Sequence, residues 1–396
     1  MKKIELLAPA GDLDKLKLAY IYGADAVYIG GKSFSLRYFA SNFNIEQIRE
    51  GVLFAHNLNR KLYVAVNMIM HNEDLRGLDE YLQTLKDIEV DAIISSSLYV
   101  VKKAKEIKLE AHMSTQLSSL NSEAVNFYYN YGSTRIVLGR EANIKEIETI
   151  CKNTKAEIEV FIHGGMCSSY SGKCMLSQVM CDRDPNRGGC AHSCRWKYYP
   201  FDKNKNPLFE NESEYLSMSS KDLCLINEVA ELAKIGVASL KIEGRMKSYN
   251  YLAIVISLYR KAIDAYYEGK PFDISSYKYM LSLAENREFA QGFIKGNVTK
   301  DEMLLEINDR FAKPGEFIAI VREYDKKDKI ATIELKNKIR NFTDYLIISP
   351  NSNLKELKIG KIFFKNQEIN EHTIAGDLLQ IECDIELKPY DLIHLK

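Results

Sequence analysis

The stretch from Ile4 to Gly30, IELLAPAGDLDKLKLAYIYGADAVYIG, decides the fold because two short apolar runs flank a helical pattern. The runs at 4–8 and 25–30 predict strands. Between them, Asp12 can cap a helix with Leu13, Leu16 and Ala19 on one face, and Gly23 can end it. A strand, a helix and a strand in this order form a βαβ unit, in which the two strands run parallel.

The same alternation continues to the end of the first two thirds of the chain. We predict six further strands at 61–67, 92–97, 109–113, 135–139, 157–163 and 239–244. After the last strand, Ser248 can cap a long helix that ends before Gly269 and Pro271. Eight such units favour an α/β fold closed as a (β/α)8 TIM-like barrel, with an open doubly wound sheet as the alternative.

The connection between the seventh and eighth predicted strands is unusually long and cysteine-rich. Five of the eight cysteines lie in one 28-residue window of it: Cys167, Cys174, Cys181, Cys190 and Cys194. The start of the chain carries no apolar signal segment and no run approaches 18 apolar residues, so we expect a cytoplasmic protein without a membrane span. Thiols stay reduced in the cytoplasm, where a group of them indicates metal binding or catalysis rather than disulfides.

The cysteine spacing favours an iron–sulfur cluster, with zinc as the alternative. Structural zinc sites usually present close cysteine pairs, and here only Cys190 and Cys194 are that close. Six residues separate Cys167 from Cys174, and such wide spacing suits a 4Fe-4S cluster better than a zinc site. Cys224 is a further candidate ligand. We expect the two remaining cysteines, Cys151 and Cys383, to be ordinary buried thiols.

Active sites of such barrels lie on the loops that follow the strands, which would place the cysteine-rich connection over the barrel mouth. The same rule nominates the polar side chains Asn67, His112, His163, Glu243, Arg245 and Lys247. Arg245 and Lys247 precede a helix start and suit an anionic ligand. A structural hydrogen bond is the alternative role for the others. A cysteine nucleophile paired with His163 or His192 is the alternative to a metal centre.

The last part of the chain has an all-β pattern. Apolar runs at 317–321 and 330–335 flank a turn at 325–329, and short strands are predicted at 345–348, 361–364, 378–383 and 392–395. We therefore predict a barrel domain at 1–272 with an insertion at 164–237, a helical or irregular connector at 273–312, and a small barrel-like β domain at 313–396. The β domain is sized to dock a substrate or a partner.

Charge gives no independent support for nucleic-acid binding. Lys plus Arg and Asp plus Glu are equal at 54 each, so no global field attracts the chain to a polyanion. The lysine-rich stretches 102–105 and 326–329 are candidates for a local basic face, with an ordinary solvated surface as the alternative.

Several motifs together resemble those of peptidase family U32, the collagenase-like peptidases. They are APAGD at 8–12, GADAVYIGG at 23–31, HGGMC at 163–167, SGKC at 171–174, the run from Arg183 to Arg195, SKDLC at 220–224 and LKIEGR at 240–245. The family includes proteins described as peptidases of unknown catalytic type and oxygen-independent hydroxylases. The hydroxylases act on a tRNA wobble uridine, on a ribosomal RNA cytidine or in ubiquinone synthesis.

The resemblance implies a 4Fe-4S cluster and prephenate as the donor of the hydroxyl oxygen. Carried over by motif, the ligands are Cys167, Cys174, Cys190 and Cys224, and Cys194 or Cys181 is the alternative for one of them. Gly165 and His192 replace residues common in the family, Ala and Gln, and neither is a proposed ligand.

The chain length resembles that of the tRNA branch, since the ribosomal RNA enzymes are longer and the ubiquinone proteins shorter. We therefore expect tRNA as the partner and 5-hydroxyuridine as the product. In this hypothesis Arg245 and Lys247 hold the donor, His163 and Glu243 are acid or base candidates, and the β domain presents the tRNA. The alternatives are a peptidase, a hydroxylase of ribosomal RNA or of a small molecule, and a protein that acts only beside a second family member.

Overall fold

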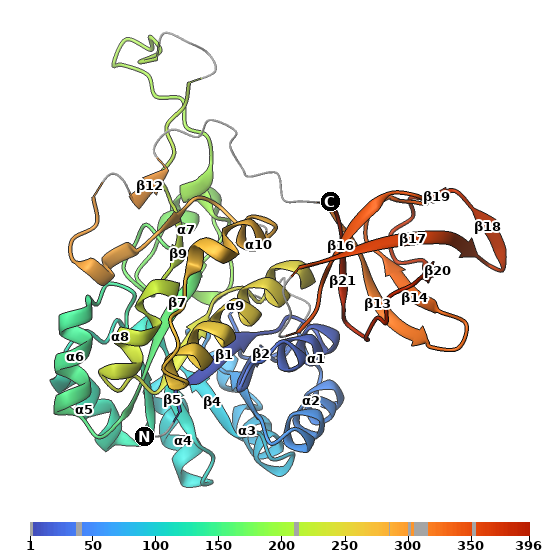
Figure 1. The fold of residues 1–396 in the computed structure, drawn as a ribbon. Coiled ribbons are helices and arrows are strands. Elements are labelled where there is room, and N and C mark those ends of the chain that lie inside the picture. Colours follow the sequence, from blue (N-terminus) through green and yellow to red (C-terminus); the bar gives the residue numbers. More distant parts are fainter. Residues whose placement is uncertain are drawn as a thin grey trace.

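The computed structural model describes residues 3–36, 42–209, 214–284, 286–299, 302–304, 316–350 and 354–396. Within these ranges the chain forms a barrel of parallel strands surrounded by helices and a smaller antiparallel barrel beside it (Figure 1). A cysteine-rich insertion rises from the parallel barrel. None of the helices in these ranges combines the length and apolarity needed to cross a bilayer.

The eight barrel strands lie where the sequence predicts them, with ends that differ by a few residues. They are β1 (Glu5–Pro9), β2 (Ala26–Gly30), β3 (Lys61–Ala65), β4 (Ala92–Ser95), β5 (Ala111–Met113), β6 (Arg135–Val137), β7 (Glu157–Gly165) and β10 (Ser239–Ile242). Each strand pairs in parallel with the next, and β10 pairs with both β7 and β1. The sheet is therefore closed, which confirms the TIM-like barrel and excludes the open sheet.

Helices pack around the outside of the barrel. They are α1 (Leu13–Ile21), α2 (Ile45–Asn57), α3 (Leu78–Asp87), α4 (Leu98–Glu106), α5 (Ser122–Tyr131), α6 (Ile144–Asn153), α8 (Val229–Lys234) and α9 (Tyr249–Tyr267). The predicted caps are present, because the Asp12 side chain accepts a hydrogen bond from the Lys15 amide and Ser248 from the Tyr251 amide. These bonds satisfy amide groups that the first helical turn leaves without a partner.

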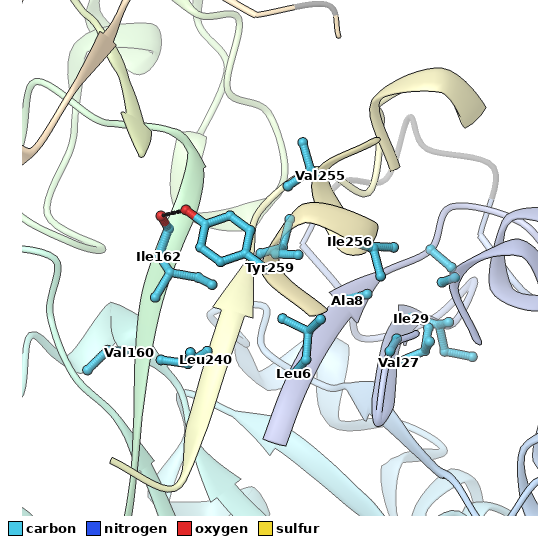
Figure 2. Packing of buried hydrophobic residues seen from close by; sticks show 14 of the residues in the cluster. Leu6, Ala8, Val27, Ile29, Val160, Ile162, Leu240, Val255, Ile256 and Tyr259 are labelled. Atoms are coloured by element: carbon cyan, nitrogen blue, oxygen red, sulfur yellow. Dashed lines mark hydrogen bonds between the residues drawn. The ribbon is translucent and has the colours of Figure 1, made fainter. Parts of the chain in front are cut away.

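The main core lies between the strands and these helices. Figure 2 shows aliphatic residues of β1, β2, β7 and β10 packed against α9, among them Leu6, Val160 and Leu240. The Tyr259 hydroxyl donates a 2.8 Å hydrogen bond to the Ile162 carbonyl across this layer. α9 packs between α1 and α8, which explains why it is buried around most of its circumference.

The inside of the barrel is partly filled by charged side chains. Arg135 donates to Glu157 at 2.7 Å and to Glu159 at 3.2 Å, and Lys241 donates to Glu159 at 2.8 Å. Arg135 also pairs with Glu5 on β1. A buried charge is tolerated only when it is paired, so this network fixes the positions of its members relative to one another.

The connection between β7 and β10 extends the sheet beyond the barrel. It contains α7 (Leu176–Cys181), the 3-10 turns η3 (Pro185–Arg187) and η4 (Ser193–Arg195), β8 (Ser219–Ser220) and β9 (Asp222–Cys224). β9 pairs antiparallel with the end of β7, so that Cys224 lies opposite His163. The insertion is thereby anchored at the carboxyl ends of the barrel strands.

Short elements follow α9 and lead to the second barrel. They are α10 (Lys278–Ser282), β11 (Phe289–Ala290), which pairs with β9, and β12 (Met303–Leu304), which pairs with β8. Residues 285, 300–301 and 305–312 of the predicted connector, and residues 313–315 of the predicted β domain, lie outside the described ranges.

The C-terminal unit is a closed antiparallel barrel of six strands, as the all-β pattern predicts. The strands are β13 (Phe317–Asp325), β14 (Ile330–Leu335), β16 (Asp344–Ile348), β17 (Lys355–Phe364), β20 (Leu378–Cys383) and β21 (Leu392–Leu395). Pairing of β16 with both β17 and β21 closes the barrel. β18 (Gln367–Ile369) extends β17, and β15 (Ile339–Arg340) pairs with β19 (Glu371–His372).

This β domain docks on α1 of the parallel barrel. Arg322 donates to both carboxylate oxygens of Asp14, at 3.1 and 2.7 Å. The buried Tyr22 hydroxyl donates to the carbonyls of Ile348 and Tyr390, at 2.9 and 2.8 Å. Ile320, Ile348 and Leu392 join the core of the large barrel, so the contact is apolar as well as polar.

Candidate active site at the barrel mouth

A cavity of about 220 Å³ lies at the carboxyl ends of the barrel strands. Its polar lining from the barrel and its loops comprises Asn67, Gln116, Arg140, Lys241, Glu243 and Arg245, together with Ser114 and Thr115. Cys167, Ser171 and Gly172 of the insertion close one side, and rings of Tyr28 and Phe161 supply apolar surface. The insertion and the strand ends therefore form one site, as the barrel rule predicts.

Three cations point at this cavity from different elements. The ammonium of Lys241 on β10 lies 4.4 Å from the centre of the Tyr28 ring and 5.4 Å from that of Phe161. The Arg140 guanidinium, after β6, lies 4.0 Å from the Phe161 ring centre. Arg245 donates to the Ser35 hydroxyl and to the Leu36 carbonyl.

The charge balance of the cavity suits an anion. Burial lowers the pKa of Lys241, and the adjacent carboxylate of Glu159 opposes that shift. Glu159 is itself held ionised: burial would raise its pKa, but Lys241 and Arg135 lower it. Glu243 is the acidic residue in the lining, facing three cations, so carboxylate or phosphate groups of a ligand find complementary charge there.

Four of the residues nominated from the sequence come together in this cavity: Asn67, Glu243, Arg245 and Cys167. The Asn67 side chain accepts a hydrogen bond from the Leu36 amide at 3.1 Å. The backbone carbonyl of Asn67 accepts one from the Gln116 side chain at 3.0 Å. The backbone of Glu243 is held at both ends, because its amide donates to the His163 carbonyl and its carbonyl accepts from Tyr251. The cavity wall is thus braced before any ligand binds.

His163 does not line the cavity, contrary to the expectation for an acid or base there. Its buried ring packs against Tyr259 and Phe289, with Nδ1 3.3 Å from the Tyr259 hydroxyl. The cause is a register shift: Phe161 pairs with Lys241, but His163 pairs with Ile242, so Ile162 is an extra residue in β7. Such a bulge reverses which face the following side chains take. Burial lowers the pKa of His163 to about 3, which keeps it neutral.

Two other nominated residues also lie outside the cavity lining. His112 is buried deeper in the barrel, 3.2 Å from the Glu110 carboxylate and 4.8 Å from the Tyr63 ring centre. Lys247 places its ammonium 4.7 Å from the centre of the Tyr251 ring. The geometry therefore gives no support to a substrate contact by His112, and it assigns the anion site to Arg245 without Lys247.

The sequence analysis missed Lys241, Arg140 and Gln116. A signal for Lys241 existed, since it lies two residues before Glu243 in an otherwise apolar strand and must therefore point to the same face. Arg140 and Gln116 stand in the connections that follow β6 and β5, where no sequence periodicity indicates which way a side chain points. Their placement follows only from the closed barrel.

The cysteines are all free thiols. Cys167 lies in the cavity wall, and burial raises its pKa, with smaller contributions in the same direction from Cys174 and Cys194 nearby. Cys224 accepts a long contact, 4.0 Å, from the Tyr259 hydroxyl. Cys181 instead donates to the Ser177 carbonyl at 3.1 Å, as a helix residue bonded to its own turn.

The cysteine thiols of the insertion are chemically suited to bind an iron–sulfur cluster. In the part of the chain that the structure describes, no three His, Cys, Asp or Glu side chains are grouped to hold a single metal ion. A cluster of several irons holds its thiolates farther apart than one ion does, and free thiols beside the cavity are the ligands it requires. Cys194, like Cys174 and unlike Cys190, is close enough to act on the pKa of Cys167, which strengthens Cys194 as the alternative to Cys190.

The comparison with known sequences decides the family. Residues 11–304 match the sequence model of peptidase family U32, and residues 314–394 match that of the U32 C-terminal domain. The chain belongs to peptidase family U32. The two matched regions cover the two barrels, so the U32 assignment extends over both.

Two U32 relatives carry the name of a tRNA hydroxylation protein. One is tRNA hydroxylation protein P1 of Bacillus subtilis (strain 168), 42% identical over 343 residues, or 85% of this chain and 81% of the relative. The other is tRNA hydroxylation protein P of Escherichia coli (strain K12), 34% identical over 404 residues, or 89% of this chain and 88% of the relative. A third U32 relative, named a collagenase, is from Porphyromonas gingivalis (strain ATCC BAA-308 / W83) and is 29% identical over 409 residues, 98% of this chain and 97% of that one.

Proposed function

We propose that this U32 protein is an enzyme that hydroxylates a wobble uridine of tRNA to 5-hydroxyuridine, with prephenate as the oxygen donor. The observation that carries the proposal is the cavity at the barrel mouth, which three cations and Cys167 line together. The two relatives named tRNA hydroxylation proteins support the reaction class. Both are similar over more than four fifths of this chain.

The cations define the place of the donor. Prephenate carries one carboxylate on its six-membered ring and a second on its pyruvyl side chain, and Lys241, Arg140 and Arg245 approach the cavity from separate elements. Two of them can therefore hold one carboxylate each while the ring lies against Tyr28 or Phe161. Fixed cations in a partly dry cavity bind carboxylates more strongly than the same groups do in water.

The proposed cofactor is a 4Fe-4S cluster held by Cys167, Cys174, Cys190 and Cys224. Such a cluster supplies an electron-transfer centre and an electrophilic metal site beside the donor. The chain itself supplies orientation and proton transfer: Arg245 fixes the donor, and the Glu243 carboxylate is the group in the cavity that can accept or return a proton.

The substrate base must reach the cavity unstacked. A nucleotide in an anticodon loop is already single-stranded, so it can enter an enzyme site at a lower cost than a base in a duplex. The size of the cavity is consistent with a small donor and the edge of one base, since it measures about 220 Å³.

A peptidase is the second candidate because one relative is named a collagenase. The geometry speaks against a cysteine peptidase at this site. Cys167 lines the cavity, but no histidine does, and His163 faces away behind the β7 bulge. A cysteine peptidase of the Cys–His type needs a histidine beside its thiol, and none of the described residues that line this wall is a histidine.

The test is nucleoside analysis of tRNA from a strain that lacks the gene. We expect 5-hydroxyuridine to be absent, to return with the wild-type gene or with Cys181→Ala, and to stay absent with Cys167→Ala. Anaerobically purified protein should form the product from unmodified tRNA only when prephenate is added. Unchanged tRNA in the deletion strain, together with cleavage of a collagen peptide by metal-free protein, would overturn the proposal in favour of a peptidase.

A further inference from the structure

The insertion exposes four aromatic rings to solvent. Tyr170 is 59% exposed, Trp196 39%, Tyr199 51% and Phe201 58%. Trp196 is the only tryptophan of the chain. Large apolar side chains on a protein surface are usually scattered, and several on one short segment indicate a binding surface.

The first of these residues, Tyr170, directly precedes residues whose backbone is held at the cavity. Tyr170 precedes Ser171 and Gly172, which line the cavity. The Ser171 amide donates to Glu141 at 2.7 Å, and the Ser171 carbonyl accepts from Ser118 at 2.6 Å. A side chain at Gly172 would lie 2.4 Å from the Gln116 carbonyl, so the loop packs directly on the barrel. Tyr170 therefore has a defined place beside the cavity entrance.

The other three rings follow Arg195, which also reaches the cavity wall. A Cβ atom at Gly165 would lie 3.3 Å from Arg195 Nη2 and 3.6 Å from Glu243 Oε2. The Arg195 guanidinium is thus close to a residue that lines the cavity. Trp196, Tyr199 and Phe201 lead outward from that point along the chain.

Arg195 lies near a second guanidinium group and near the carboxylates of Asp222 and Glu243. In the ranges that the structure describes, Arg195 makes no ion pair, whereas the neighbouring Arg287 donates to Asp222 at 3.0 Å. Burial and the positive charge of Arg287 lower the pKa of Arg195, and the carboxylates of Asp222 and Glu243 oppose that shift. A guanidinium group without an ion pair of its own can bind a phosphate through its N–H groups.

The charge of this segment is opposite to that of a nucleic acid. From Cys167 to Lys205 there are seven Lys or Arg residues and three Asp residues, in a chain whose total charges balance. One of these cations, Arg187, pairs with Asp74, and in the lysine-rich stretches considered from the sequence Lys103 pairs with Asp79 and Lys326 with Glu386. Cations interleaved with exposed rings are the combination that binds single-stranded nucleic acid, because rings stack on bases and cations meet phosphates.

We propose that Arg195 and the exposed rings of Tyr170, Trp196, Tyr199 and Phe201 bind the single-stranded loop of the RNA substrate. Bases next to the target stack on the rings, and the Arg195 guanidinium binds a phosphate beside the nucleotide that enters the cavity. This surface on the insertion, and not the β domain, then positions the substrate. The inference rests on the proposed RNA substrate and names the residues that bind it.

The unique tryptophan makes a direct test available. The full-length protein, purified anaerobically with its iron, is titrated with an unmodified tRNA anticodon stem-loop while Trp196 emission is followed. Stacking of a base on the indole quenches this emission, so we expect saturable quenching. Unchanged Trp196 emission at saturating RNA would overturn the proposal that an RNA base stacks on this side chain.

Variants separate stacking from general stability. Trp196→Leu and Tyr199→Leu keep apolar bulk but remove the aromatic face, and each should weaken binding of a fluorescein-labelled stem-loop by about 5- to 100-fold. Arg195→Gln should lower the slope of log Kd against log salt by about 0.7. Phe342→Leu is the matched control, because Phe342 is 83% exposed on the β domain. Iron content and circular dichroism should match the wild type in all four.

The outcomes distinguish this inference from the proposed function. Loss of 5-hydroxyuridine in the deletion strain with unchanged Kd in the Leu variants would overturn the surface and leave the function standing. Weaker binding in Phe342→Leu alone would assign docking to the β domain. Binding of a peptide but of no RNA, with unchanged cellular tRNA, would overturn both.

Discussion

The ammonium of Lys241 lies 2.8 Å from the carboxylate of Glu159, and both side chains are buried inside the parallel barrel. Lys241 also lines the cavity, whereas Glu159 lies beneath it and contacts Arg135. Glu159 is therefore a positioning residue. It keeps a cation at the cavity floor and connects that cation to the network that fills the barrel.

Removing the charge of Glu159 should show how far the fold depends on this buried ion-pair network. We expect Glu159→Gln to lower the free energy of unfolding by roughly 3–5 kcal/mol, because two buried cations lose their shared counter-charge. Urea denaturation measures the change. Lys338→Gln is the control, since Lys338 forms an ion pair with the exposed Glu371, and its effect should stay below about 1 kcal/mol. Equal effects of the two variants would show that the buried network is not structurally important.

Gly30 should control the position of Arg245. A Cβ atom at Gly30 would lie 1.8 Å from Arg245 Nη1, so Gly30→Ala forces the guanidinium out of its place in the cavity. We expect hydroxylation to fall at least as far as in Arg245→Lys, with KM for prephenate rising. Gly360→Ala is the control, because its nearest neighbour would be at an ordinary 3.4 Å in the β domain. Full activity of Gly30→Ala would contradict a role for Arg245 in binding the donor.

Cysteine-to-alanine variants should differ in whether the purified protein retains iron. Cys167→Ala, Cys174→Ala and Cys224→Ala should lose bound iron and the broad visible absorbance of the cluster. Cys181→Ala should keep both, because its thiol is already bonded to the Ser177 carbonyl. We expect Cys190→Ala to lose iron and Cys194→Ala to retain it. The opposite result for this pair would make Cys194 the fourth ligand, in agreement with its proximity to Cys167.

Arg322 should hold the β domain on α1. Its guanidinium contacts both oxygens of Asp14 and also Glu334, and Arg322→Met removes these charged hydrogen bonds. We expect the free energy of unfolding to fall by about 1–2 kcal/mol and amide exchange in α1 to accelerate. Lys326→Met, which removes an exposed pair with Glu386, should change neither quantity. Unaltered exchange in Arg322→Met would mean that the apolar contact alone holds the domain.

Glu110 should contribute to acid sensitivity. The hydrogen bond from His112 lowers the pKa of Glu110 to about 2, from an ordinary value of 4.5. Between these two values the unfolded chain binds more protons than the folded one, so the stabilisation is present above pH 4.5 and is lost as the pH falls towards 2. In Glu110→Gln the free energy of unfolding should therefore vary less with pH below 4.5. Parallel pH profiles of variant and wild type would contradict this coupling.

The local sequence was sufficient to predict the two barrels. Alternating strand and helix signals, with caps at Asp12 and Ser248, are local properties, and their order around a closed sheet leaves few topologies. The position of the cysteine-rich insertion after the seventh strand followed from the same order. Asn67, Glu243 and Arg245 were therefore nominated from their places at strand ends, and Cys167 from the cysteine-rich window, and all four line the cavity.

The tertiary structure decided which side chains face the cavity. The single extra residue Ile162 in β7 turns His163 away from the site, and no periodicity in the sequence announces such a bulge. Barrel closure brings Lys241, Arg140 and Gln116 together from distant segments, which local patterns do not specify. The placement of the Arg195 guanidinium near Glu243 depends in the same way on how the insertion folds back, because the direction of a side chain is a property of the whole packed chain.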